Sequence, residues 1–186
     1  MKLAELDPET LARAQRGEPV AFRALYERYA DVVYAFVRRM LGDDATAEDA
    51  LQDTFLRVAR SLPSFDVDGA AALSTWILSI ARRAALTPRR PVPSIAREPD
   101  VAPAPVELQG TRRRLENALA ALSPEQRMVF VLRELSQLSY EEIAQTIAID
   151  VGTVRSRLHR ARAALQASLA DLLDQHEDTN GRKAGR

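Results

Sequence analysis

The sequence contains no cysteine, so disulfide bonds, thiolate metal sites and thiol redox chemistry are excluded. Its two histidines, His159 and His176, are too few for a histidine metal centre. A Gly-rich phosphate loop, a Ser/His/Asp set and paired acids in an apolar setting are also absent. We therefore expect a protein that is not an enzyme and that uses no cofactor and no metal.

Long apolar runs are missing as well. No segment approaches the ~20 consecutive apolar residues that cross a membrane. The first ten residues, MKLAELDPET, lack the apolar core of a signal peptide. These absences predict a cytoplasmic protein without membrane insertion.

The chain has no excess charge of either sign, because 26 bases balance 26 acids. The charges are nevertheless unevenly placed: residues 1–87 carry eleven bases and thirteen acids (net −2), and residues 111–186 carry twelve bases and ten acids (net +2). A neutral protein with one basic face binds nucleic acid locally and weakly. We therefore expect DNA affinity, if present, to depend partly on a partner.

What the chain does contain is a pair of closely spaced helix signals in Ser139–Arg162, SYEEIAQTIAIDVGTVRSRLHRAR. Ser139 with Glu142 is a capping-box pattern that predicts a helix from Tyr140. Asp150 is a second N-cap candidate and predicts a helix from Val151. A short helix, a tight turn and a second helix form the helix-turn-helix arrangement, whose second helix enters the major groove of DNA.

The second helix combines a predicted buried stripe with a basic remainder. Val154, Leu158, Ala161 and Leu165 recur at spacings of three and four. Four arginines lie off this stripe, and residues 151–166 contain no acid. The plainer alternative is a helical hairpin with a solvated arginine face, but the acid-free helix and the two adjacent caps favour DNA binding.

This stretch resembles the C-terminal DNA-reading domain, region 4, of bacterial extracytoplasmic-function (ECF) sigma factors, which contacts the upstream promoter element. The family usually has Gly where this chain has Ala148 and Pro where it has Asp150, so the turn is expected to be slightly reshaped. The resemblance implies a DNA-facing set of Arg155, Ser156, Arg157, His159 and Arg160.

The N-terminal part reads as a series of helices. Residues 8–16 predict a short helix that ends at Gly17, and a long helix follows from Pro19 to Gly42. Thr46 with Asp49 predicts the start of a third helix that ends near Leu62. Ser74–Leu86 predicts a fourth helix, and we interpret most aromatic side chains of this part as core.

AFRALYERYADVVYAFVRRMLG followed by AEDALQDTFLRVARSLPSF resembles region 2 of the same sigma factors. Both regions occur in the family's order, over roughly residues 20–86 and 112–167. In that family the third helix docks on the clamp of core RNA polymerase, whereas without the resemblance its polar face would be read as solvated surface. The resemblance implies a polymerase-binding set of Asp49, Gln52, Asp53, Phe55, Leu56 and Arg57.

The segment that would melt the downstream promoter element departs from the family pattern. Family members usually continue from the Trp helix with Asn, Asp and several bases, but here small residues and Pro88 follow. The preceding loop, residues 66–72, is acidic and small and has no aromatic to stack on an unpaired base. Trp76, Arg82 and Arg83 are the candidates that remain for this element.

Prolines concentrate in residues 88–110, which we interpret as a linker. At ~3.1 Å per residue an extended Pro-rich chain reaches roughly 70 Å, about two turns of DNA at ~34 Å each. The predicted fold is all-α, with two small helical domains joined by a Pro-rich linker and a helix-turn-helix in the C-terminal one. The domains are residues 1–87 and 111–175, and residues 176–186 are expected to be a disordered tail.

The predicted function is that of a sigma factor, which binds core RNA polymerase and promoter DNA of the −35 and −10 type. An anti-sigma factor is a further candidate partner. Two alternatives remain open: a stand-alone helix-turn-helix regulator, which should dimerise to read a palindrome, and a sigma-mimicking module that captures an anti-sigma factor. The degenerate melting segment favours the mimic, and the arginine set of the last helix counts against it.

Overall fold

The computed structural model describes residues 5–87, here called the N-terminal half, and residues 106–183, the C-terminal half. Within them every regular element is a helix, which confirms the all-α prediction. The N-terminal half contains α1 (Pro8–Gln15), α2 (Pro19–Leu41), α3 (Asp44–Ser61), the 3-10 turn η1 (Leu62–Ser64) and α4 (Leu73–Leu86). The C-terminal half contains α5 (Val106–Ala121), α6 (Pro124–Glu134), α7 (Tyr140–Ile147) and α8 (Val151–Lys183).

Local sequence signals explain where the first helices begin and end. The Asp7 carboxylate caps α1 by accepting a hydrogen bond from the Thr10 amide at 2.8 Å. Gly42, with φ 90°, ends α2 in the left-handed region. The predicted start of α3 was wrong: the cap is Asp43, whose carboxylate accepts from the Thr46 amide at 2.8 Å. The chain therefore reverses directly after Gly42, and α3 begins at Asp44.

Two boundaries in the C-terminal half also differ from those predicted. Helix α5 begins at Val106, so the last five residues of the predicted linker are helical. No proline follows Pro105 until Pro124, and extending an existing helix costs much less than nucleating one. Helix α8 continues to Lys183, so most of the tail predicted to be disordered is helical. Residues 88–105 and 184–186 of these two segments lie outside the described residues.

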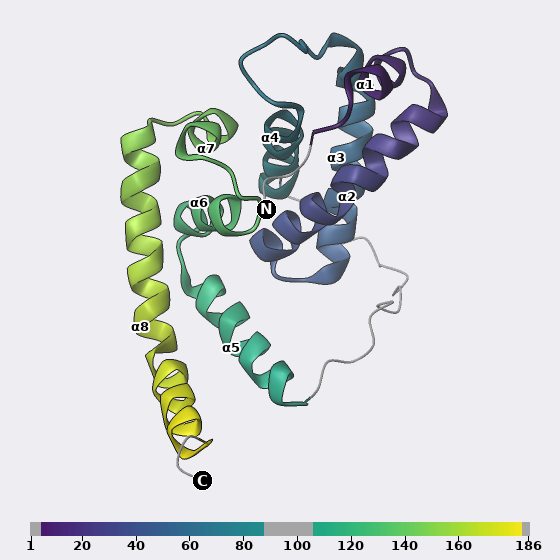
Figure 1. The fold of residues 1–186 in the computed structure, drawn as a ribbon. Coiled ribbons are helices and arrows are strands. Elements are labelled where there is room, and N and C mark those ends of the chain that lie inside the picture. The colour runs from purple at the N-terminus through teal and green to yellow at the C-terminus, as the bar shows by residue number, and fades with distance from the viewer. Residues whose placement is uncertain (1–4, 88–105, 184–186) are drawn as a thin grey trace.

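The two halves contact each other directly. Helices α2, α3 and α4 pack together in the N-terminal half, and α6 and α7 pack on α8 in the C-terminal half. Between the halves α7 contacts α4, and α6 contacts α2. In Figure 1 α6 and α7 accordingly lie between the N-terminal half and α8, which forms one edge of the molecule.

One hydrophobic cluster runs through both halves. It includes Leu25, Phe36 and Ile77 from the N-terminal half and Leu132 and Ile143 from the C-terminal half, all fully buried. A smaller cluster joins α5 to α8 through Ala118, Leu119, Leu122, Ala161 and Leu165. The C-terminal half thus packs on the N-terminal half by burying apolar surface, which is the dominant favourable term in association.

None of the helices within residues 5–87 and 106–183 combines the length and the apolar character that a membrane span requires.

Candidate nucleic-acid and polymerase interfaces

The helix-turn-helix forms as predicted. The Ser139 hydroxyl accepts a hydrogen bond from the Glu142 amide at 3.1 Å, and the Glu142 carboxylate accepts from the Ser139 amide at 2.7 Å. This reciprocal capping box starts α7 at Tyr140. The turn is made without glycine, because Ala148 itself adopts the left-handed conformation, with φ 55° and ψ 56°.

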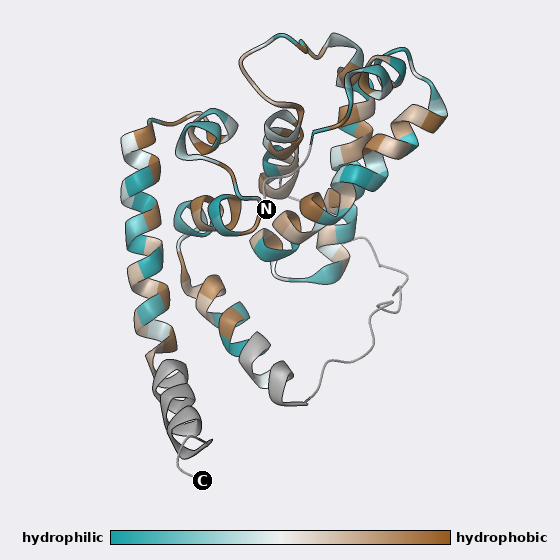
Figure 2. Ribbon diagram, in the orientation of Figure 1, coloured by the Kyte–Doolittle hydropathy of each residue, from teal (hydrophilic) through white to brown (hydrophobic). Residues whose placement is uncertain are grey.

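The predicted buried stripe of α8 is confirmed. Val154, Leu158, Ala161 and Leu165 are all buried, at 0–6% exposure. On the opposite side Arg155, Ser156, His159 and Arg160 are exposed, at spacings that place them on one face of the helix. We call these four residues the open face of α8. Hydrophilic residues recur turn after turn along the part of this helix that Figure 2 draws in colour.

Two further arginines of α8, Arg157 and Arg162, lie at the borders of this face. Arg162 pairs with Glu134 of α6 at 2.6 Å and so ties α8 to its own half. Arg157 is half-buried and lies near Glu125. The pKa of Glu125 is lowered by hydrogen bonds from the backbone and the Ser123 hydroxyl, with a further contribution from the positive charge of Arg157. By contrast, the structure records no ion pair for Arg155, His159 or Arg160 with any residue that it describes.

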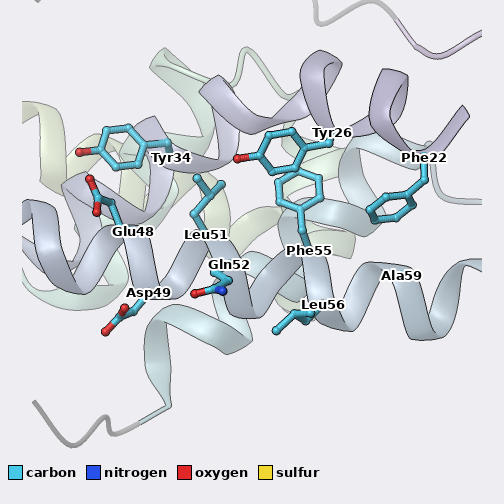
Figure 3. Close-up of a pocket in the computed structure, with 10 residues that line it drawn as sticks. All are labelled: Phe22, Tyr26, Tyr34, Glu48, Asp49, Leu51, Gln52, Phe55, Leu56 and Ala59. Carbon is cyan, nitrogen blue, oxygen red and sulfur yellow. The ribbon is translucent and has the colours of Figure 1, made fainter. Parts of the chain in front are cut away.

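A groove of about 570 Å³ runs between α2 and α3. Its inner wall is aromatic: Tyr26 meets Phe55 edge-on, with ring centroids 4.7 Å apart. In Figure 3 Phe22, Tyr26 and Tyr34 reach from α2 toward α3. Asp49, Gln52 and Leu56 lie further from α2 than Leu51 and Phe55 do, so they form the outer rim of the groove on α3 (Figure 3). The groove is lined by Phe22, Tyr26, Tyr34, Glu48, Asp49, Leu51, Gln52, Phe55, Leu56 and Ala59.

The predicted polymerase-binding residues divide into three groups. Asp49, Gln52 and Leu56 line the groove from its outer rim, and Leu56 is 51% exposed although it is apolar. Phe55 also lines the groove, but it is a buried residue of its floor. Asp53 and Arg57 are not among the lining residues and instead form an ion pair one helical turn apart, at 3.0 Å.

The three candidates for the downstream element do not gather on one face of α4. Trp76 packs on Phe65 with ring centroids 4.9 Å apart, and Arg83, seven residues further, lies on the same side and is exposed. Arg82 lies on a different side, and its Nε is buried without a hydrogen-bond partner among the described residues. Of the three, only Arg83 is classed as exposed; Trp76 and Arg82 are half-buried.

The aromatic residues that α2 contributes to the groove, Phe22 and Tyr26 among them, are functional candidates that the sequence analysis assigned to the core. Phe22 and Tyr26 follow the helical period of the α2 core residues, so their pattern alone does not separate them from it. The 40% exposure of Tyr26 distinguishes it only once α3 is in place.

Family models match both halves of the chain. The model described as "Sigma-70 region 2" covers residues 25–90, and the model "Sigma-70, region 4" covers residues 112–165. "ECF RNA polymerase sigma factor SigL" of Mycobacterium tuberculosis is 33% identical, over 86% of this chain and 94% of that protein. The chain belongs to the ECF sigma factors of the sigma-70 family.

Solved sigma-factor structures share the fold. CnrH in complex with the cytosolic domain of CnrY superposes with a TM-score of 0.69 at 24% identity, covering 88% of this chain and 96% of that one. RpoE of Bartonella quintana in complex with the anti-sigma factor NepR gives a TM-score of 0.61 at 24% identity, covering 80% and 96%. At this identity the likeness supports the arrangement of helices alone.

As an ECF sigma factor the chain directs RNA polymerase to promoters at the start of transcription, and its partners are core RNA polymerase and promoter DNA. Region 2 in the same chain as the helix-turn-helix favours this role over a stand-alone repressor.

Proposed function

We propose that three surfaces of this sigma factor carry its three binding tasks. The open face of α8, with Arg157 at its border, binds the upstream promoter element. The groove between α2 and α3 binds core polymerase, and α4 binds the downstream promoter element. All three tasks are binding tasks, so we assign the chain no catalytic step. Because both partners are found in the cytoplasm, we place its action there.

The observation that carries the upstream assignment is the open face of α8. Two arginines and a histidine project from one side of a helix-turn-helix recognition helix, and the described residues offer them no competing carboxylate. Arginine donates two hydrogen bonds to guanine in the major groove or one charge to a phosphate. Arg157, half-buried at the border of the open face, is better placed for the phosphate role than for base reading.

The polymerase assignment rests on the composition of the groove. Exposed apolar side chains rarely gather without a partner, and Tyr26 and Leu56 are both exposed at its edge. Glu48 and Asp49 add negative charge to the rim. The surface therefore suits a helix that carries an apolar stripe flanked by bases, and we assign this helix to the polymerase clamp, as the family resemblance implies.

We further propose that an anti-sigma factor competes for the same groove. The similar RpoE was solved with its anti-sigma factor NepR. An apolar, acidic-rimmed groove that binds one amphipathic helix can accept another, so we expect the anti-sigma factor to inhibit by direct competition.

The sigma-mimic reading keeps one supporting observation. Most of α4 is buried, and its last turns carry Ala81, Ala84 and Ala85 where polar residues would be needed to engage melted DNA. A mimic would bind the anti-sigma factor but would not start transcription. Transcription from a matched promoter with purified core polymerase distinguishes the two readings.

The residue assignment is tested by Arg155→Ala, Arg157→Ala and Arg160→Ala in the polymerase complex, against a panel of upstream-element mutants. Loss of a base contact should cost about 1–3 kcal/mol and relax the preference at one position. Loss of a phosphate contact should weaken binding to all promoter sequences alike. It should also lower the slope of log binding constant against log salt concentration by about one.

Arg114→Ala is the matched control, since Arg114 is an exposed arginine of α5 outside the helix-turn-helix. Its removal changes the net charge equally and should leave promoter preference unchanged. If all three α8 variants behave like this control, α8 does not read DNA and the upstream assignment is wrong.

A further inference from the structure

The loop 66–72 leads from η1, at the end of α3, into α4 (Figure 1). The N-terminal segment of the described chain lies beside this loop. A cavity of about 230 Å³ between the two is lined by Leu6 and Leu11 from the N-terminal segment and by Val67 and Ala71 from the loop. Specific hydrogen bonds join the same two segments at both ends of the loop.

The start of the loop is held by a side chain of α1. The Gln15 amide group donates hydrogen bonds to the carbonyls of Phe65, at 2.8 Å, and Leu62, at 3.2 Å. These carbonyls lie where the helical turns of α3 and η1 end, and backbone carbonyls at a helix end need partners from outside the helix. Gln15 thus fixes the direction in which the chain leaves η1.

The end of the loop is held by Glu5. Ala72, the N-cap residue of α4, has no side chain that can accept a hydrogen bond from the first-turn amides. The Glu5 carboxylate accepts instead, from the Ser74 amide at 3.3 Å and from the Ser74 hydroxyl at 2.5 Å. A carboxylate in this place also interacts favourably with the helix dipole. Glu5 therefore caps the start of α4 although it lies 69 positions before Ser74.

Glu5 is itself held in place by α2. The buried Tyr29 hydroxyl donates to the Glu5 carboxylate at 3.2 Å and accepts from the Leu6 amide at 3.1 Å. Burial, with a further contribution from the negative charge of Glu5, raises the pKa of Tyr29. The hydroxyl therefore stays protonated and remains a donor to Glu5.

The hydrogen bonds within the loop join only near neighbours. The Asp68 amide donates to the Asp66 carboxylate at 3.1 Å, and the Gly69 amide donates to the Asp66 carbonyl at 3.3 Å. Residues 66–70 are all exposed. The position of the loop on the molecule therefore depends on its two ends, which Gln15 and Glu5 hold.

We propose that residues 5–15, here called the N-terminal brace, hold the loop 66–72 and the start of α4 in the conformation that engages the downstream promoter element. Glu5 and Gln15 are then positioning residues, which act through the loop and α4 without touching DNA. A segment that is already ordered loses less conformational entropy on binding. This inference rests on the proposed function in one respect: it takes α4 as the surface that binds the downstream element.

The first test measures the mobility of the loop without DNA. The chain has no cysteine, so Ala70→Cys supplies a single site for a spin label, and Ala70 is exposed and is not among the cavity-lining residues. Electron paramagnetic resonance of the free, full-length protein should show a mainly immobilised label. Glu5→Ala and Gln15→Ala should each increase the mobile part of the spectrum, because each releases one end of the loop.

Glu18→Ala is the matched control. It also removes a carboxylate near the N-terminus, but this carboxylate pairs with Arg13 and Arg16, at 2.7 and 3.1 Å, and not with the loop. The label should therefore stay as immobile as in the wild-type background. Circular dichroism and binding of core polymerase check that all variants fold.

The second test measures open-complex formation by the polymerase holoenzyme on a panel of downstream-element mutants. In Glu5→Ala and Gln15→Ala the preference for the matched downstream element should fall by roughly five-fold, because a loosened loop must be ordered on the DNA. Preference at the upstream element and affinity for core polymerase should stay at the wild-type level. A role in stability alone would instead lower activity on every promoter alike.

Glu5→Gln separates positioning from a direct effect of charge on DNA. Its side-chain carbonyl keeps an acceptor at the same reach, so most of the wild-type preference should be retained. If Glu5 acted through its negative charge, Glu5→Gln would behave like Glu5→Ala, and that result would overturn the positioning role of Glu5.

The proposal falls if the label at residue 70 is as immobile in Glu5→Ala and Gln15→Ala as in Glu18→Ala. It also falls if the loop becomes mobile and downstream preference stays unchanged while Arg83→Ala alters it; the assignment of α4 to the downstream element then stands. If Arg83→Ala leaves that preference unchanged as well, the assignment of α4 is wrong and the positioning role falls with it.

Discussion

Ala148 meets the strictest backbone requirement of the helix-turn-helix, because its φ of 55° lies in the region that L-residues with a Cβ occupy at a cost. Ala148→Gly should therefore raise the free energy of unfolding by about 1 kcal/mol. Ala163→Gly is the control, since Ala163 is exposed within the regular helical part of α8. This variant should lower the free energy of unfolding by about 1 kcal/mol. Urea denaturation of both variants measures the difference, and equal destabilisation would contradict the strain at Ala148.

Residue-scale features governed by short-range chemistry were predictable from the sequence. The two capping boxes, at Ser123 and Ser139, form because each pairs residues only three positions apart. The burial of Val154 and Leu158 follows from helical spacing alone. The proximity of Arg157 to Glu125 was not predictable, because Glu125 belongs to another helix.

At the scale of elements, α3 carries the groove that we assign to polymerase. Asp49→Lys reverses the charge at the outer rim without disturbing the ion pair of Asp53 with Arg57. It should weaken co-purification with core polymerase and leave the melting temperature nearly unchanged, since Asp49 is half-exposed, forms no ion pair with a described residue, and charges on a helix surface contribute little to stability. Asp53→Lys is a poorer probe, because it also leaves Arg57 facing a like charge.

Asp31→Lys supplies the control for this experiment, because Asp31 is exposed on α2 and is not one of the groove-lining residues. Wild-type recovery of polymerase with Asp49→Lys would show that the groove rim does not dock on it.

Element-scale prediction failed where a boundary depended on context. Thr46 belongs to a residue type that often caps helices. The cap is nevertheless Asp43, which directly follows the left-handed Gly42 and whose carboxylate accepts a hydrogen bond from the Thr46 amide. Similarly, the aromatic residues that α2 contributes to the groove recur with the same helical period as the core residues of α2. Which side of Tyr26 stays uncovered depends on how α3 packs, and the sequence of α2 alone does not contain that information.

At the scale of the whole molecule, the sequence predicted two domains on a tether but not the contact between them. That contact is made by residues far apart in the chain: Arg127 and Met40 are 87 positions apart. No local pattern encodes such a pair. The sequence of α4 gave a weak signal, since a helix that is apolar on nearly all sides needs more than one neighbour to cover it.

The shared core makes a prediction about unfolding. Trp76, the only tryptophan, lies in the N-terminal half and reports on it, whereas far-UV circular dichroism reports on the helices of both halves. Because one hydrophobic cluster joins the halves, the two signals should give coincident urea midpoints in the wild-type protein. Arg127→Gln removes the charged hydrogen bond between the halves, worth about 1.5–3 kcal/mol, so the midpoints should separate. Arg133→Gln removes the hydrogen bond that Arg133 donates to the Leu138 carbonyl, at 2.8 Å within the C-terminal half, so it should move both signals together. Separation of the midpoints in that variant as well would mean that Arg127 does not couple the halves.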